Sequence, residues 1–384
     1  MEVEIAQSKV NTERFLHGIW YYAKFHGFFP DLEYKLWQKG FVGFVVIWVN
    51  IGTMLSFLIQ LFYIRDIKEF ADNFPMNISV VTCLLKFLVI LRMRVKLVGD
   101  INEYFAKLDG MRLSERQVVK LQGLILFCNR LTSVVAVLYT LVSTSTAINA
   151  ASSRERILMF NVWIPYDFRQ SMWIYWTTLL FQYFCFIILA LENLTNDLTA
   201  PLYFIMLRAH LEIVMERIKN IGWDPLKTQE ENYKDFIGCI EDHRIVMEIY
   251  NILQNTISST IFIQFASTAI VVAIEILVIL LFAINFTQIV MLLITTLAAT
   301  IQILFCCYYV NNFTVVTNEL VTAIYFSNLF DQSMQFRKTA IIFMQMTQKP
   351  KVVMAGKMFP VTLTTFASIM RTSYSILTVA NQLR

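Results

Sequence analysis

The chain has 384 residues, of which 57% are hydrophobic and only 16% are charged, and its formal net charge is +4. Soluble domains usually contain roughly 45–50% apolar residues, so this composition excludes an ordinary soluble domain. The small positive charge does not indicate a nucleic-acid partner, because the basic residues lie between apolar runs. Several apolar runs of about 20 residues instead predict a helical protein that crosses a membrane repeatedly.

The amino-terminal segment, residues 1–40, is balanced in charge and has no pattern of a cleaved signal peptide. We expect it to lie in the cytoplasm, and we expect the first span, about Phe41 to Ile64, to act as the signal anchor. Five more spans are expected within residues 41–310, and a last one within residues 359–384. Their predicted bounds are Met76–Leu91, Leu121–Ser145, Trp173–Leu194, Thr256–Ala283, Thr287–Val310 and Phe359–Arg384.

Helical patterns continue beyond several of these spans. Apolar residues recur at steps of three and four in the segments that follow spans four and six and in the segment that leads into span five. These pieces are too apolar to be loose loops, so we expect them to pack with residues 311–358 into a cytoplasmic helical anchor layer. The predicted helices are Leu202–Ile221, Glu230–Leu253, Asn318–Phe326 and Arg337–Gln348.

The distribution of charge predicts the orientation. Most of the 32 basic residues lie before span one and after spans two, four and six. Cytoplasmic loops carry an excess of Lys and Arg, so the amino terminus is predicted to be cytoplasmic, and seven crossings place the carboxyl terminus outside. This is the reverse of a rhodopsin-like receptor. The sequon Asn77-Ile78-Ser79 then falls beside an outside loop, which makes Asn77 a candidate glycosylation site close to the membrane.

The sequence contains no recognisable catalytic motif. Its four His residues lack metal-ligand spacing, and neither a phosphate-binding loop nor a nucleophile elbow is present, so we expect neither an enzyme nor a cofactor. The ionisable residues expected within spans are Lys86, Arg130, Glu275 and Arg371. For Lys86 and Arg130 we expect a structural ion pair or contact with the membrane interface. Glu275 lies deeper and is a functional candidate whose partner the sequence does not identify.

The final predicted helix carries a polar stripe. Small polar side chains recur along it at steps of three and four residues, which places them on one face. Polar groups are costly in lipid, so this face belongs inside a bundle or beside water. Two interpretations are open: hydrogen bonds to neighbouring helices, or the lining of a conduction path. The stripe consists of Thr365, Ser368, Thr372, Ser375, Val379 and Gln382.

Motifs in the carboxyl-terminal third resemble the signature end of insect odorant receptors. They are AIYFSNLFDQ, FRKTAIIFMQMTQKP and AGKMFPVTLTTFASIMRTSYSILT. Three stretches around spans four and five agree: WIPYDFRQSMWIYWTTLLFQY, HLEIVMERI and HRIVMEIYNILQNTISSTIFIQF. The resemblance covers most of the chain from Trp163 onward. The long cytoplasmic insertion before span five that is typical of the shared co-receptor is missing, so the chain looks like a ligand-specific tuning subunit.

The resemblance implies an all-α, seven-helix subunit of an odorant-gated, non-selective cation channel in the plasma membrane of olfactory sensory neurons. Four subunits would surround one pore, with the co-receptor as partner in a heterotetramer and the anchor layer as the main subunit contact. The last helix would line the pore, with Ser375 among its pore residues. In the same helix, Val379 and Leu383 match the family's hydrophobic gate and Gln382 matches its polar pore residue. The sequence offers no acidic ring there, so weak discrimination among permeant cations is expected.

The resemblance also implies a ligand pocket in the outer half of the subunit, among spans two, three, four and six. Aromatic and aliphatic walls with a few hydroxyls suit a small neutral volatile compound. Packing within the helix bundle is the ordinary alternative for each residue taken singly. The segments concerned offer Val81, Thr82, Tyr139, Ser143, Tyr175, Leu179, Tyr183, Met291 and Thr295.

A gustatory-receptor-like channel subunit of the same architecture is the main alternative function. A G-protein-coupled receptor is disfavoured by the reversed orientation and by the lack of an acidic-Arg-aromatic triplet in the third span. A transporter with inverted repeats is disfavoured because the sequence has no matching pair of broken spans.

Overall fold

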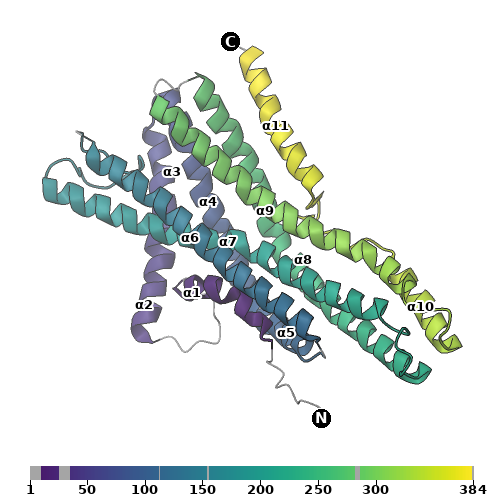
Figure 1. Ribbon diagram of the computed structural model, residues 1–384. Coiled ribbons are helices and arrows are strands. Elements are labelled where there is room, and N and C mark those ends of the chain that lie inside the picture. The colour runs from purple at the N-terminus through teal and green to yellow at the C-terminus, as the bar shows by residue number, and fades with distance from the viewer. Residues whose placement is uncertain (1–9, 26–34, 112, 154, 282–285, 383–384) are drawn as a thin grey trace.

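The computed structural model describes residues 10–25, 35–111, 113–153, 155–281 and 286–382. Helices make up nearly all of its regular structure, which confirms the predicted all-α class (Figure 1). Among the described residues, six helical runs are long and apolar enough to cross a membrane. The seventh expected helix is the shorter and more polar α11 (Leu363–Gln382).

The helices follow the predicted order along the chain. A 3-10 turn (Thr12–Leu16) leads into α1 (His17–Phe25), and the first membrane-length run consists of α2 (Leu36–Phe44), a π-helical stretch (Val45–Gly52) and α3 (Thr53–Tyr63). A second π-helical stretch (Lys96–Asp100) joins α4 (Ile67–Val95) to α5 (Ile101–Asp109). The long helices that follow are α6 (Glu115–Ser152), α7 (Met172–Lys219), α8 (Gln229–Leu281) and α9 (Phe286–Tyr325), and α10 (Met334–Thr347) precedes α11.

Helix α7 joins the predicted fourth span to its expected cytoplasmic continuation in one helix of 48 residues. It passes through Pro201, which has no backbone N–H and would weaken an isolated helix. Here Leu202 and Tyr203 are fully buried on one side of the proline, and Thr199 Oγ1 donates a hydrogen bond to Thr195 O at 2.6 Å on the other. Packing and hydroxyl bonds of this kind allow proline within long membrane helices.

The predicted anchor layer is present. We use this name for α5, α10, the carboxyl-terminal parts of α7 and α9 and the amino-terminal part of α8, which pack around one apolar core at the lower end of the molecule in Figure 1. The rings of Phe236 in α8 and Phe336 in α10 lie 4.6 Å apart, and Arg217 in α7 pairs with Asp242 in α8 at 2.5 Å. Gly222 follows α7 with φ of 82°, and its carbonyl accepts a bond from Asn328. These contacts fix the positions of α7, α8 and α10 relative to one another.

The amino-terminal helix docks onto this core. Phe15 is fully buried and its ring meets those of Phe105 and Tyr203 edge-on, at 5.7 and 5.4 Å. Thr12 N donates to Asp109 Oδ2 at 2.7 Å and so ties the first turn to the end of α5. The stretch Thr12–Leu16 is therefore packed into the molecule, whereas Leu36 and Trp37, just before the predicted first span, are exposed.

The predicted start of the last helix is wrong by a few residues. Phe359 and Pro360 form strand β2, which pairs antiparallel with β1 (Met354–Ala355). The turn between them has φ of 58° at Gly356 and 60° at Lys357, a geometry in which glycine is strongly preferred. Helix α11 begins only at Leu363, after the small strands.

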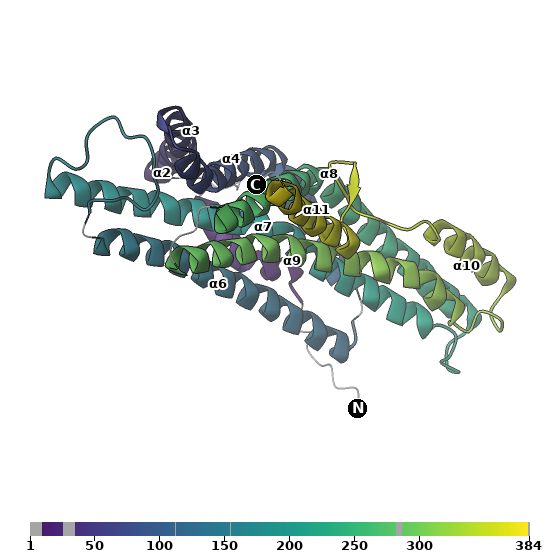
Figure 2. The same cartoon turned by 90° about the horizontal axis from the view of Figure 1, so that it is seen from above.

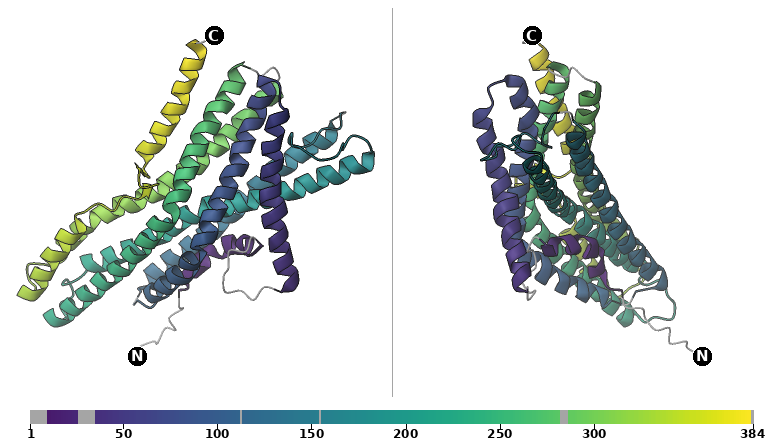
Figure 3. Two further views of the ribbon diagram at one scale, coloured as in Figure 1. Left: turned by 180° about the vertical axis from the view of Figure 1, so that it is seen from behind. Right: turned by 90° about the vertical axis from the view of Figure 1, so that its left-hand side faces the viewer.

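Helix α11 stands at the edge of the bundle, on the side away from α3 (Figures 1 and 3). It rests against α8 and α9 (Figure 2). Ser373, buried on this contact face, donates to Ala269 O of α8 at 3.2 Å. The opposite face of α11 is left uncovered by the described part of the chain.

Candidate ligand cavity and pore helix

An apolar cavity of about 660 Å³ lies in the half of the bundle remote from the anchor layer. It is bounded by α4, α6, α7 and α9, which are the second, third, fourth and sixth membrane-length helices. Its volume falls within the roughly 300–1,000 Å³ that is usual for small-molecule sites. The wall consists of Met76, Ser79, Val80, Cys83, Leu141, Val142, Ser143, Ser145, Thr146, Phe160, Phe186, Leu189, Ala190, Asn193, Ile294 and Thr295.

Two of the predicted ligand residues, Ser143 and Thr295, line this cavity. Val81 and Thr82 do not, although their chain neighbours Val80 and Cys83 do, because a shift of one residue turns a helical side chain by about 100°. Thr82 instead lines a small polar cavity of about 50 Å³ next to the larger one. The cavity thus lies among the predicted helices, with Val80 and Cys83 of α4 in its wall, and the ligand contacts stay a prediction.

The four other predicted residues whose side chains are described, three of them tyrosines, have packing partners outside the cavity wall. Tyr175 Oη donates to Ala150 O at 3.1 Å, and Leu179 is buried in the same cluster. The Tyr183 hydroxyl lies 3.0 Å from Thr144 Oγ1. The fourth is Tyr139, which belongs to a polar cluster. The ninth, Met291, has a side chain outside the described part of the structure.

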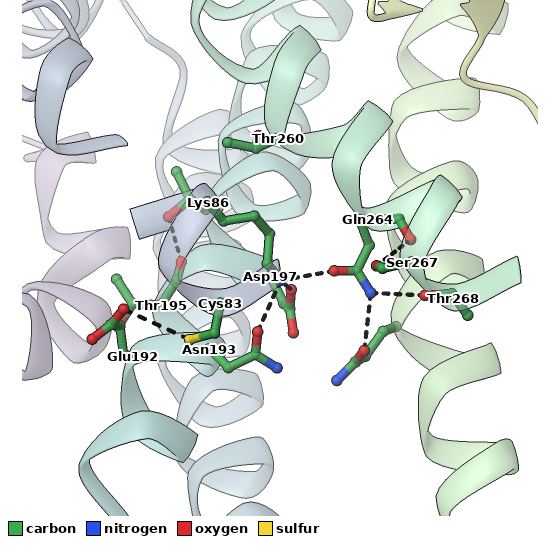
Figure 4. Close-up of polar contacts among 12 residues, drawn as sticks. Cys83, Lys86, Glu192, Asn193, Thr195, Asp197, Thr260, Gln264, Ser267 and Thr268 are labelled. Atoms are coloured by element: carbon green, nitrogen blue, oxygen red, sulfur yellow. Dashed lines mark hydrogen bonds and ion pairs between the residues drawn. The ribbon is translucent and has the colours of Figure 1, made fainter. Parts of the chain in front are cut away.

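One residue from each of five helices forms a closed ring of hydrogen bonds at membrane depth, which we call the five-helix ring. Lys86 Nζ in α4 donates to Asp197 Oδ1 in α7 at 2.6 Å and to Gln264 Oε1 in α8 at 2.7 Å (Figure 4). Gln264 Nε2 donates to Gln302 in α9 at 3.1 Å, and Gln302 donates to Tyr139 in α6 at 2.5 Å. Tyr139 closes the ring by donating to Asp197 Oδ2 at 3.3 Å.

The ring satisfies a buried charge. Lys86 is only 2% exposed, and a buried ammonium is costly unless it is paired and hydrogen-bonded. Its third N–H donates to Asn193 Oδ1 at 2.8 Å, so all three donors have acceptors. Of the two expectations for Lys86, a structural ion pair or contact with the membrane interface, the structure shows the ion pair.

A second buried carboxylate, which the sequence does not reveal as buried, lies one turn from the ring. Glu192 is fully buried and accepts hydrogen bonds from Asn50 Nδ2 at 2.9 Å and from Cys83 Sγ at 3.6 Å.

Asn193 and Asp197, the two α7 residues that bind Lys86, share a helix face because they are four residues apart. That spacing, at and just past the predicted end of span four, is the sequence feature that could have located the partner of Lys86.

The other predicted intramembrane charges differ in their surroundings. Glu275 in α8 is buried, and Thr296 Oγ1 in α9 donates to its carboxylate at 2.7 Å. Arg130 and Arg371 are exposed on the surface of the isolated chain. Glu275 therefore joins α8 to α9 beside the cavity wall at Thr295.

The polar stripe lies on the uncovered face of α11. Ser368, Thr372 and Ser375 are exposed, and their hydroxyls donate to carbonyl oxygens four residues earlier in the same helix. The hydrogen bond from α11 to Ala269 of α8 comes instead from Ser373, which lies off the stripe. The predicted pore side chains Val379 and Gln382, and all of Leu383, lie outside the described residues.

Asn77, the candidate glycosylation site, is 3% exposed and donates through Nδ2 to Asn73 O at 3.0 Å. That nitrogen is the atom to which a glycan would be attached, so this packing disfavours modification of the folded chain. Glycosylation of Asn77 stays a prediction.

Comparisons with known proteins agree with this fold. The model of the family described as 7tm Odorant receptor matches residues 66–374. Odorant receptors 59b and 33b of Drosophila melanogaster are 24% and 28% identical to this chain, over 91% and 89% of it and 87% and 89% of their own length.

Two structures of the insect olfactory receptor OR5 from Machilis hrabei have the same fold. Their TM-scores are 0.78 and, for the complex with eugenol, 0.79, at 14% and 15% sequence identity. The alignments cover 96% and 97% of this chain and 100% and 98% of those chains.

The helical fold and the apolar cavity between its helices define a multi-pass membrane protein built like an insect olfactory receptor. This chain belongs to the 7tm Odorant receptor family, because the family model matches most of its length. Membership of a receptor family confirms both the family predicted from the sequence and the prediction that the protein is not an enzyme.

Proposed function

We propose that this chain is the ligand-specific subunit of an odorant-gated, non-selective cation channel. It binds a small neutral volatile compound in the 660 Å³ cavity and opens a pore lined by α11. The cavity is the observation that carries this proposal. It is apolar and lies between four membrane helices, and its few polar groups suit an uncharged molecule better than an ion. OR5 from Machilis hrabei binds eugenol, which is likewise a small uncharged molecule.

The exposed stripe on α11 supports the pore assignment. Hydroxyls at Ser368, Thr372 and Ser375 lie on a face that the described part of the chain does not cover. Around a symmetry axis, four such faces would line a polar channel, and a ring of Val379 and Leu383 beyond them would stop ions by dewetting. Gln382 would offer amides to the partly hydrated cation.

The partner of this subunit is the shared odorant receptor co-receptor, in a heterotetramer at the plasma membrane of olfactory sensory neurons. The amino terminus is cytoplasmic, so the anchor layer lies in the cytoplasm and the ligand cavity lies in the outer half. The absence of the co-receptor's long insertion before α8 supports the role of tuning subunit. Exposed Met334 in α10 of the anchor layer, together with exposed Leu226 and Phe330 in the loops beside it, provides apolar area for the subunit contact.

Recording currents in cells that express this chain with and without the co-receptor, across a panel of volatile compounds, tests the proposal. We expect inward cation current only with both subunits and an active odorant. Odorant responses that persist without the co-receptor and depend on a G protein would contradict it.

A further inference from the structure

The amide group of Asn193 has a fixed orientation in the wall of the cavity. Lys86 Nζ can only donate hydrogen bonds, so the amide oxygen of Asn193 must face it, at 2.8 Å. The amide nitrogen of Asn193 consequently points away from Lys86 (Figure 4). Since Lys86 is itself held by Asp197 and Gln264 in the five-helix ring, this orientation is maintained by three helices.

The amide nitrogen of Asn193 is available to a ligand. No hydrogen bond joins it to any residue that the structure describes, and Asn193 lines both the large apolar cavity and the small polar cavity beneath it. The side chain is only partly buried, so its nitrogen is not sealed within protein. It is an N–H donor that is already oriented before a ligand arrives.

Most hydroxyl groups of the cavity wall already donate their single proton to a backbone carbonyl oxygen. Ser79 donates to Pro75 O at 2.9 Å, and Ser145 and Thr146 both donate to Val142 O, at 2.8 and 3.0 Å. Thr295 likewise donates within its own helix, to Leu292 O at 3.0 Å. The Ser143 hydroxyl can rotate to donate or accept. Asn193 is thus the donor whose direction is set by the protein.

We propose that Asn193 determines ligand specificity by donating a hydrogen bond to an acceptor oxygen, so that the preferred ligands are volatile carbonyl compounds such as ketones and esters. This inference rests on the proposed function, because it concerns the ligand of the same cavity. The apolar part of the molecule would lie among Val80, Leu141 and Phe186. A hydrocarbon of the same shape would leave the Asn193 donor without a partner.

The expected effect follows from the net free energy that one neutral hydrogen bond contributes to binding. Its net contribution of about 0.5–1.5 kcal/mol corresponds to roughly a twofold to thirteenfold preference for a ketone over an alkene of the same shape. The preference is expected to come mainly from the cost of an unsatisfied donor, as in other sites that reject analogues lacking a polar group.

The test uses a homologous series of methyl ketones, each paired with the alkene in which a methylene group replaces the carbonyl oxygen. Binding to the purified full-length protein is followed by thermal stabilisation, and gating by current in cells that also express the co-receptor. Asn193→Asp keeps the acceptor for Lys86 and removes the N–H donor, and Asn193→Leu removes both. Thr140→Val is the matched control, because Thr140 lies in α6 outside the cavity wall and its hydroxyl donates to Ala136 O at 2.8 Å.

We expect the wild-type protein and Thr140→Val to prefer the ketone of each pair, and both Asn193 variants to lose that preference while alkene binding is kept. A wild-type protein that does not distinguish the pair, or Asn193 variants that keep the preference, would overturn the inference. If Asn193→Leu does not fold, Asn193→Asp decides alone. Ketone-selective stabilisation without any current would contradict the channel function and leave the inference standing.

Discussion

A single residue, Lys86, helps to hold together the membrane-spanning half of the molecule. An ammonium taken out of water costs several kcal/mol, and attraction to a carboxylate offsets this only if the remaining donors are also bonded. Asp197 provides the charge, and the oxygens of Gln264 and Asn193 satisfy the other two N–H groups. The arrangement fixes five helices relative to one another directly below the cavity.

Removing one partner of the Lys86–Asp197 ion pair is expected to destabilise the protein strongly. Lys86→Met leaves Asp197 buried without its cation, and we expect a loss of about 3–5 kcal/mol. The double variant Lys86→Met/Asp197→Leu removes both charges and should recover much of that loss. Thermal unfolding of the purified protein measures both effects, with the exposed Arg130→Met as control. A single variant as stable as the wild type would show that Lys86 is not held as described.

Asp109, which lies outside the membrane-spanning helices, allows a test of stability against pH. Burial raises its pKa above the ordinary carboxyl value, although two hydrogen bonds from Thr12 act in the opposite direction. The folded state therefore holds this proton more tightly than the unfolded chain, and ionisation costs stability as the pH rises through the raised pKa. Asp109→Asn has no such titration and can keep bonds to both Thr12 groups.

We accordingly expect Asp109→Asn to unfold at a higher temperature than the wild type near neutral pH. The advantage should shrink as the pH falls below the ordinary carboxyl pKa, where Asp109 is protonated in both states. The exposed Asp100→Asn serves as control. A variant that is less stable by the same amount at every pH would mean that the bonds of the carboxylate outweigh its burial.

The sequence points to the charged residue at position 86 but not to its partners. Lys86 stands out because it interrupts the apolar run of the second predicted span. Asp197 and Glu192 instead lie where the apolar run of the fourth span ends in polar sequence. Tyr139, predicted as a ligand residue, bonds to Asp197 and Gln302 and is not part of the cavity wall. Helical periodicity predicts which residues share a face, but it does not say which neighbour that face meets.

At the scale of elements, the β1–β2 hairpin sets where α11 leaves the anchor layer. Gly356 N donates to Ser258 O of α8 at 2.9 Å, and Gln254 bonds to both the N–H and the carbonyl of Met354. Thr362 Oγ1 then accepts from Thr365 N at 3.2 Å, as the cap of a helix does. These hydrogen bonds therefore tie the hairpin at the base of α11 to α8.

Gly356→Ala is expected to weaken this joint. A Cβ at that position would lie 2.8 Å from the ring of Phe262, and positive φ costs a non-glycine residue roughly 1–2 kcal/mol. We expect a lower unfolding temperature and altered odorant-evoked current at normal surface expression. Gly123→Ala in α6, where a Cβ meets nothing within 4 Å, should be neutral or stabilising. Equal behaviour of the two variants would rule out a role for the hairpin geometry.

Apolar runs predict the helices well and their ends poorly. Hydropathy locates six of the runs because about 20 apolar residues in succession match the thickness of a bilayer's hydrocarbon core. The uninterrupted course of α7 through Pro201 depends on tertiary packing, which overrides the local preference against proline. The hairpin before α11 depends on α8, since Ser258 Oγ donates to Met354 O across a separation of 96 residues. Local sequence cannot supply contacts of that range.

At the scale of the whole molecule, the orientation is a prediction from charge. A cytoplasmic amino terminus and an outside carboxyl terminus place the cavity on the odorant side. Epitope tags at the two ends, stained in intact and permeabilised cells, measure it. We expect the carboxyl-terminal tag alone to be accessible in intact cells. Accessibility of the amino-terminal tag would reverse the topology and reopen the possibility of G-protein coupling.

The central claim is that an odorant opens a pore lined by α11, and cysteine accessibility tests it most directly. Cys is introduced at Val379, Gln382 and Leu383 in turn, in cells that express the co-receptor, and a charged thiol reagent is applied with and without odorant. Because a dewetted gate excludes ions until it widens, we predict that modification changes the current and is faster with odorant. Odorant-evoked currents that no cysteine at these positions alters would contradict the claim and leave the stripe as a packing surface.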